Sequence, residues 1–343
     1  MTTTPHPLVT RARQLADDLL APNAETVDQS EVPAGHIAAI KRSGLLGIGA
    51  PEEFGGAAAP ASVVRQTAEV LSGACCSTWF VQTQHHTPVA TLVKGAPPVR
   101  ERLLGPMARG ELLSGVAYAH LRAYPRTPVR VVRERGGWRF DGTVPWYTGW
   151  GLNDVMLLAG VTDSGEALFA FTEAREQPGL RASPPMRLAA LTAARTVSLE
   201  LDGLWLAEEA VTLRTPFEQW AAEDRPKTVT ASPAVFGVTE AALGLLDDDT
   251  AGPLRTRLAE IRDRAYTLAD EAGPNEHLDE RLALRLRSYE VMRAATTAAV
   301  VSGGGRSMAL TSKAQRLARE AMFLLVQGQT AESRRAHLGV LAS

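Results

Sequence analysis

The sequence predicts an α+β protein in which an N-terminal helical domain, a central antiparallel β domain and a C-terminal helical bundle follow one another. Three observations predict it. Apolar residues recur at helical spacing in residues 8–110 and again after residue 216. Between these regions, short and often alternating segments are broken by Gly-Gly, Asp-Gly and Ser-Gly pairs. The order contains no βαβ alternation, which excludes a Rossmann domain.

The first domain is expected over residues 1–110. Amphipathic helices are predicted within residues 8–20, 32–47 and 61–74 because their apolar residues share one face. The stretch IGAPEEFGGAAAP at residues 48–60 is rich in Pro and Gly, which marks a loop between the second and third of these helices.

The β domain is expected over residues 111–215. Its strands are predicted within residues 114–121, 127–149, 154–173 and 194–206, where β-branched and aromatic residues alternate with polar ones.

The C-terminal domain, residues 216–343, is expected to be a bundle of four-helix type. Its periodic segments cover residues 253–272, 279–301 and 312–328. The last two are apolar around much of their circumference, which is typical of helices buried within the chain or against another subunit. We therefore expect at least a dimer.

Composition limits the function classes. The 343 residues are 45% hydrophobic and 22% charged, which is ordinary for a globular protein. The net charge of -2 does not indicate the excess of basic residues that is typical of nucleic-acid-binding proteins. No apolar run is long enough to span a membrane, and the first residues do not resemble a signal peptide. The adjacent Cys75 and Cys76 suit a reducing cytoplasm. With His85 and His86 they match no zinc pattern, so no metal site is predicted.

The segment GTVPWYTGWG at residues 142–151 combines a large aromatic surface with a hydroxyl. Trp146 and Thr148 are two positions apart, and on a strand such residues point to one face. A flat stacking surface beside a hydroxyl suits a planar heteroaromatic ligand. The alternative is a strand with an aromatic core residue.

Four segments, in order, resemble the acyl-CoA dehydrogenase superfamily over nearly the whole chain. They are KRSGLLGIGAPEEFGG, GWRFDGTVPWYTG, RTVSLELDGLWLAEEAV and RLAREAMFLLVQGQT. The resemblance implies that family's three-part fold and a bound FAD. It implies that Trp146 packs against the flavin ring, that the Thr148 hydroxyl lies near its N5, and that the backbone near Tyr147 contributes.

Three departures from the family pattern bear on chemistry, and the first concerns the strand that lines the flavin. The family's Thr-Glu-Pro-x-Ala-Gly-Ser-Asp run is replaced by GVAYAHLRAYPRTP, with Ala119 and His120 in place of the Thr and Glu. Tyr118 and His120 become candidates for the cavity wall, although His120 is as well explained as a surface or satisfied histidine.

The second departure is the catalytic base. The family's C-terminal Glu aligns with Gly328, or with Gln327 after a one-residue shift, and neither accepts a proton. Some members place the base before an arginine on a middle helix, which here would make Asp224, followed by Arg225, the candidate pair. The alternative is that Asp224 caps a helix beginning at Arg225–Pro226.

The third departure is at the phosphate end of the cofactor. The family's Arg-x-x-Phe-Gly motif is missing, and Val300 and Val301 replace a Gln, although Gly304 and Gly305 remain as candidate FAD contacts. Charge-assisted contacts to phosphate are the strong ones. Their loss predicts weaker FAD binding, use of FMN, or contacts supplied by a partner.

Three functions follow from this reading. The first is a flavin-dependent oxidoreductase of the acyl-CoA dehydrogenase type, acting on an acyl thioester or a similar small molecule. The second is a flavin monooxygenase on the same fold, in which the protein positions the substrate and excludes water from the flavin. The third is a non-catalytic subunit of a mixed oligomer with a complete dehydrogenase. A homodimer, a homotetramer or such a mixed oligomer is expected.

Overall fold

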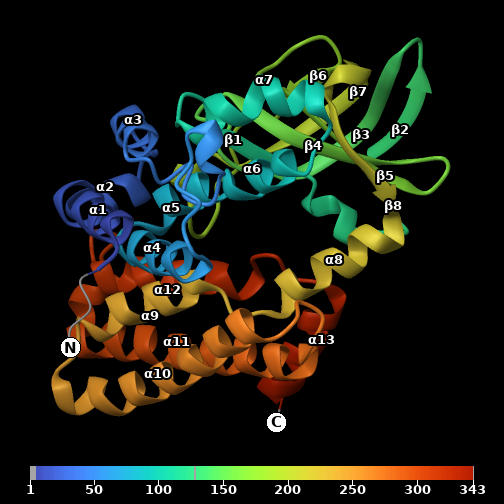
Figure 1. Ribbon diagram of the computed structural model, residues 1–343. Helices are drawn as coiled ribbons and strands as arrows, with labels where there is room; N and C mark the ends of the chain where they lie inside the picture. Colours follow the sequence, from blue (N-terminus) through green and yellow to red (C-terminus); the bar gives the residue numbers. More distant parts are fainter. Residues whose placement is uncertain (1–4, 127–128, 343) are drawn as a thin grey trace.

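The computed structural model describes residues 5–126 and 129–342, and its elements run from helices through strands to helices (Figure 1). The first set of helices is α1 Pro7–Leu15, α2 Ala21–Asp28, α3 Ala34–Arg42, α4 Ala61–Ala74, α5 Cys76–Thr83, α6 His86–Val93 and α7 Pro97–Ala108. A π-helical turn, Ala16–Leu20, joins α1 to α2.

The strands are β1 Ser114–Ala117, β2 Val129–Glu134, β3 Gly137–Tyr147, β4 Val155–Thr162, β5 Glu166–Glu173, β6 Leu180–Ala182, β7 Val197–Ala207 and β8 Val211–Pro216. The closing helices are α8 Phe217–Val229, α9 Pro233–Leu243, α10 Asp248–Glu271, α11 Leu278–Gly303, α12 Lys313–Val326 and α13 Ala331–Ala342. Short 3₁₀ turns, η3 Ala119–Ala123 and η6 Gly304–Met308, follow β1 and α11.

Local chemistry accounts for several helix starts. The Ser232 hydroxyl accepts a hydrogen bond from a backbone N–H at the start of α9, and Pro233 occupies the first helical position. The Asp247 carboxylate caps α10 in the same way by accepting from Thr250 N. Extended backbone at Cys75 separates α4 from α5, because a residue with those dihedral angles cannot continue a helix.

The strands form one sheet in the order β6-β7-β3-β2-β4-β5-β8, with β1 also paired to β4. Most neighbours are antiparallel, as expected from the sequence, but β4 runs parallel to both β1 and β2. The sheet is therefore mixed. Gly-Gly and Ser-Gly pairs predict hairpins correctly, whereas pairings between strands that are distant in sequence leave no local signal.

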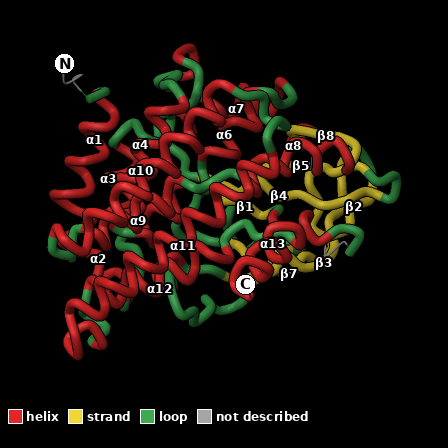
Figure 2. The backbone as a smooth tube through the Cα atoms, turned by 90° about the horizontal axis from the view of Figure 1, so that it is seen from below, coloured by secondary structure: helices red, strands yellow, loops and turns green. Residues whose placement is uncertain are grey.

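The sheet curls so that β4 and β5 contribute to two cores. One face, with Leu157 and Phe169, packs against α6, α7 and α8. The other face, with Met156 and Leu168, packs against β2, β3 and β7. Figure 2 shows the strands gathered at one end of the molecule and most helices at the other.

The N-terminal and C-terminal helices share one hydrophobic core. Buried residues of α1 to α5 cluster with those of α9 to α12, and α4 packs along α9 (Figure 1). Helices separated by the whole sheet in sequence thus bury their apolar faces together. Among the described residues, no helix combines the length and apolar character needed to cross a membrane.

Candidate functional site

The end of β3 exposes an indole where the regular strand pattern breaks. The register against β7 shifts between Val144 and Tyr147, so that two residues of β3 lie opposite Ser198 alone. Val144 and Tyr147 both enter the core, whereas Trp146 is 56% exposed. The indole is therefore not a core residue, and its open apolar face is available to a flat ligand or a partner.

The residues that follow Trp146 are held in place by a buried polar network. The hydroxyls of Thr148 and Thr196 lie 3.1 Å apart, and Thr148 is buried. Asn153 Nδ2 donates to the Tyr147 hydroxyl and to the Thr148 carbonyl, both at 2.9 Å. A Cβ at Gly149, which has φ +85°, would lie 2.5 Å from the Asn153 amide. This close approach explains why a glycine follows the threonine.

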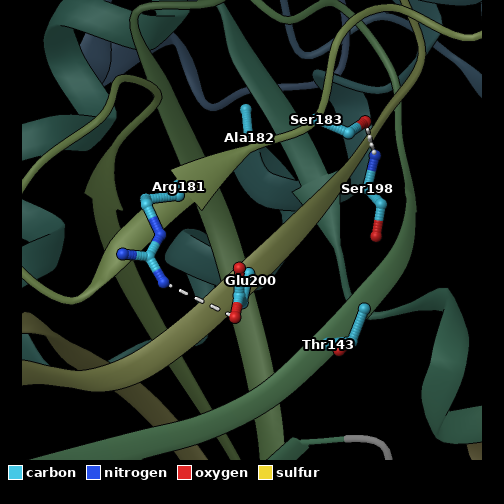
Figure 3. A pocket seen from close by; sticks show the side chains of 6 residues that line it. All are labelled: Thr143, Arg181, Ala182, Ser183, Ser198 and Glu200. Atoms are coloured by element: carbon cyan, nitrogen blue, oxygen red, sulfur yellow. Dashed lines mark hydrogen bonds and ion pairs between the residues drawn. The ribbon is translucent and has the colours of Figure 1, made fainter.

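A hollow of about 440 Å³ lies on the outer face of the same strands, shown in Figure 3. It is lined by Thr143, Arg181, Ala182, Ser183, Ser198 and Glu200. Thr143, Glu200 and Arg181 form one row across β3, β7 and β6, and Arg181 and Glu200 are 3.5 Å apart. Because Ser198 lies opposite the Trp146 bulge, this hydroxyl-lined hollow adjoins the exposed indole.

The exposed indole of Trp146, the buried hydroxyl pair of Thr148 and Thr196, and a polar hollow on the same strands are the features that a flavin ring could use. The role of Trp146, Tyr147 and Thr148 in holding a flavin stays a prediction. The phosphate end is different: Gly304 and Gly305 are exposed in η6, and a Cβ built on either would meet no atom within 4 Å. These two glycines form no cradle with the other described residues of one chain.

Tyr118 and His120 lie on the core face that α6, α7 and α8 cover. The Tyr118 ring packs against Phe169, with ring centroids 5.4 Å apart, and burial raises the pKa of its phenol to about 12. His120 Nε2 lies 3.0 Å from the Ala159 carbonyl, to which it donates. Its Nδ1 is buried with no hydrogen-bond partner among the described residues. The role of both residues in cofactor binding stays a prediction.

The environment of His120 keeps its ring neutral. Burial lowers its pKa to about 4, although the bond to the Ala159 carbonyl acts in the opposite direction. A neutral imidazole that donates from Nε2 has an acceptor at Nδ1.

Asp224 lies in the interior of α8 and is bound by an arginine that the sequence analysis did not identify. Arg122 donates from Nε to Oδ2 at 2.6 Å and from Nη2 to Oδ1 at 3.0 Å. Asp224 is only 4% exposed. Burial alone would lower the pKa of Arg122, but the bonds and charge of Asp224 raise it. The helix begins at Phe217, so the alternative that Asp224 caps a helix starting at Arg225 is wrong.

The turn after α12 occupies the position where the resemblance places a catalytic Glu. Gln327 ends the helix and Gly328 follows with φ +63°. Arg285 donates to the Gln327 carbonyl at 3.0 Å and to the Thr230 carbonyl at 3.1 Å, which ties α12 to the end of α8. Arg122 Nη1 lies 3.6 Å from the point where a Cβ on Gly328 would be. The turn is thus bordered by two guanidinium groups.

Arg225 does not share the environment of Asp224. Its guanidinium forms two hydrogen bonds to Glu332 of α13, at 2.7 and 3.1 Å, on the surface. Arg122 lies inside the segment GVAYAHLRAYPRTP, but no local pattern in the sequence shows that it pairs with a residue 102 positions later.

His85 has a structural environment. Ser114 N donates to its Nδ1 at 3.0 Å, and its Nε2 donates to the Met107 carbonyl at 3.2 Å. Burial lowers its pKa to about 3. Cys75 and Cys76 are buried free thiols. Within the described residues, no cluster of three His, Cys, Asp or Glu side chains could hold a metal ion.

Comparison with known sequences gives one family and one curated relative. The family model described as "Acyl-CoA dehydrogenase, N-terminal domain" matches residues 3–111. The chain is 24% identical over 157 residues to the short-chain specific acyl-CoA dehydrogenase of Clostridium acetobutylicum. That match covers 44% of this chain and 41% of the relative, so it spans about two fifths of the relative's length.

Similar solved structures extend over nearly the whole chain. Butyryl-CoA dehydrogenase from Megasphaera elsdenii is 15% identical and has a TM-score of 0.83, with 100% of both chains covered. A glutaryl-CoA dehydrogenase from Mycobacterium smegmatis in complex with FADH2 is 18% identical, with a TM-score of 0.80 and coverage of 100% and 95%. Dibenzothiophene monooxygenase from Paenibacillus sp. A11-2 is 15% identical, with a TM-score of 0.80 and coverage of 97% and 96%. At these identities the likeness shows the fold.

Proposed function

Because the chain belongs to the acyl-CoA dehydrogenase superfamily, we propose that it is a flavin-dependent oxidoreductase acting on a small molecule. The observation that carries the proposal is the exposed indole of Trp146, followed two residues later by the buried Thr148 hydroxyl. A bound flavin supplies two-electron redox chemistry that no side chain provides. The protein's part is to hold the ring, orient the substrate and exclude water.

FAD is the proposed cofactor, with FMN as the alternative. The glutaryl-CoA dehydrogenase of M. smegmatis was solved with FADH2, and this chain shares its fold. The exposed glycines of η6 supply no phosphate cradle within one chain. FAD binding would therefore need contacts from a second subunit, whereas FMN would need fewer of them.

Acyl-thioester dehydrogenation, the first candidate reaction, requires a base for a weakly acidic α-proton. Asp224 remains the proposed base, whereas Arg225, which follows it in the chain, binds Glu332 on the surface. Both Asp224 oxygens accept hydrogen bonds from Arg122, so proton uptake by Asp224 would disrupt a buried ion pair. A slow reaction is expected for that reason.

Monooxygenation is the second candidate, and the Gly328 turn favours it. That turn presents a glycine in place of a carboxylate, and the nearby Asp224 is neutralised by Arg122. Dibenzothiophene monooxygenase has this fold, which supports oxygen chemistry as a use of the same site.

Two measurements separate these reactions. For the dehydrogenase, butyryl-CoA added without oxygen should bleach the flavin, and Asp224→Asn should slow that bleaching. For the monooxygenase, butyryl-CoA should cause no bleaching, and oxygen should be consumed only when a flavin reductase is added. A colourless protein that acquires flavin only with a related subunit would contradict both and support a non-catalytic role.

Self-association is proposed from an exposed apolar surface on the C-terminal helices. Its large side chains are Val301, Met308, Leu310, Met322, Val326 and Leu338, all more than half exposed. These side chains are spread over α11, η6, the turn that follows η6, α12 and α13, and exposed apolar surface on a soluble protein often marks an interaction site. A dimer or larger oligomer would cover them, and a sedimentation mass of 36.7 kDa would contradict the proposal.

A further inference from the structure

The Arg122–Asp224 pair, like the Arg319–Asp28 pair, joins a deeply buried carboxylate to a partly open guanidinium. The Asp224 side chain is 6% exposed, and the Arg122 side chain is 22% exposed. Arg122 uses Nε and Nη2 to bind the carboxylate. Its Nη1 forms no hydrogen bond to any described residue. The carboxylate therefore fixes the plane of the guanidinium and leaves one edge unused.

That unused edge faces an open backbone position. Among the described residues other than its two chain neighbours, Arg122 Nη1 alone lies within 4 Å of a Cβ built on Gly328, at 3.6 Å. Gly328 has no side chain to fill the space, and its φ of +63° disfavours residues that do. A donor that is oriented by a buried acid and faces free space is prepared to bind an acceptor.

The charges around the turn favour an anion. The charges of Arg122 and Asp224 cancel, and the exposed Arg225 forms an ion pair with Glu332 at 2.7 Å. Arg285 is buried, donates to backbone carbonyls at the C-terminal ends of α8 and α12, and lies 5.4 Å from the centre of the Tyr289 ring. Helix C-termini carry partial negative charge, which stabilises Arg285 without an ionised partner. The ionised side chains named here therefore leave an excess of one positive charge.

An apolar surface lies one helical turn away. Phe323 precedes Gln327 by four residues, so both lie on one face of α12. Its ring meets that of Phe80 from α5 edge-on, with centroids 4.7 Å apart. The two rings add an apolar surface to the helix whose C-terminal turn borders Arg122.

We infer that Arg122 is a substrate-binding residue that takes the carboxylate of a small apolar acid, and that Asp224 positions it. The inference deepens the proposed function and rests on it, because it names the class of small molecule that the proposed oxidoreductase would bind. A carboxylate can accept from Nη1 with a charge-assisted hydrogen bond, which a neutral amide cannot match. The step is binding alone, with no bond made or broken.

The test compares two probes of equal size, hexanoate and hexanamide, by isothermal titration calorimetry on the full chain at low ionic strength. We expect hexanoate to bind at least about tenfold more tightly than hexanamide, as for a hydrogen bond to a charged group. Arg122→Met/Asp224→Leu removes the whole pair and should reduce that ratio to within about twofold, because apolar replacement of both partners avoids a stranded charge.

The matched control is a bidentate pair on the surface, Arg130 and Asp163, with donor–acceptor distances of 2.7 and 2.9 Å. Arg130→Gln/Asp163→Asn should leave the ratio unchanged. Gly328→Ala keeps the Arg122 pair and places a methyl group beside Nη1, so it should weaken hexanoate binding at least about tenfold. Circular dichroism confirms that each variant is folded.

Equal binding of the two probes by the wild type would overturn the inference, even if the double variant failed to fold. A ratio that survives in the folded double variant would also overturn it. Flavin content, measured separately by absorbance, distinguishes the two proposals. A protein without flavin that still prefers hexanoate would contradict the proposed function alone, whereas a yellow protein without the preference would contradict this inference alone.

Discussion

Lowering the pH from 7 to 5 should destabilise the protein through its buried histidines, of which His85 and His120 are two. Burial lowers the pKa of His85 to about 3 and of His120 to about 4, so both rings stay neutral in the fold at pH 5. In the unfolded chain a histidine has a pKa of about 6.5 and takes up a proton over this range. The unfolded state thus binds more protons, and stability falls as the pH drops below about 6.5.

The size of the effect follows from those values. Between pH 7 and pH 5, the unequal proton uptake lowers the free energy of unfolding by about 2 kcal/mol per histidine, or about 4 kcal/mol for both. His120→Gln removes one titrating ring and keeps an N–H that can donate to the Ala159 carbonyl. Between pH 7 and pH 5, the free energy of unfolding of the variant should therefore fall by about 2 kcal/mol less than that of the wild type.

Urea unfolding at pH 7, 6 and 5, followed by tryptophan fluorescence and circular dichroism, measures this difference. Other acidic groups also titrate, but they are common to the wild type and the variant and cancel in the comparison. The reasoning would be refuted if His120→Gln and the wild type lost equal stability between pH 7 and pH 5.

Three further changes test the packing. Arg316→Met should lower the free energy of unfolding by about 3–5 kcal/mol, because it leaves the Glu320 carboxylate buried without a partner. In urea titrations, the double variant Arg316→Met/Glu320→Leu should recover most of that loss. Gly149→Ala should lower the free energy of unfolding by about 1–3 kcal/mol, because residue 149 has φ +85° and its new methyl group would collide with the Asn153 amide. An unchanged thermal unfolding temperature would show that this contact is absent. Val301→Asp should reduce the sedimentation mass towards that of one chain if the exposed apolar surface is an interface, and an unchanged mass would place the interface elsewhere.

The order of elements was predictable because periodicity and turn residues are local properties. Helical spacing in residues 61–74 predicted α4, whose bounds in the structure are Ala61–Ala74. The parallel pairing of β4 with β1 and β2, and the core shared by the first and last helices, were not predicted. Both depend on contacts between distant segments, which leave no periodic trace.

The candidate site was predictable only in part for the same reason. The sequence singled out Trp146 and Thr148, but strict alternation could not anticipate the bulge that exposes the indole. Asp224 drew attention as a base or a cap, whereas its partner Arg122 is 102 residues away in the chain. A buried ion pair joining two elements becomes visible only once the fold brings them together.

The central claim is that Trp146 and Thr148 hold a flavin, and cofactor titration tests it most directly. The wild type, stripped of any flavin and titrated with FAD and with FMN, should bind one of them and retain its visible absorbance through desalting. Trp146→Ala should weaken that binding at least about tenfold, since aromatic stacking and apolar contact are both lost. Trp205→Ala, which removes another exposed indole from β7, should not. A wild-type protein that binds neither flavin, or a Trp146→Ala variant that binds as tightly as the wild type, would contradict the account.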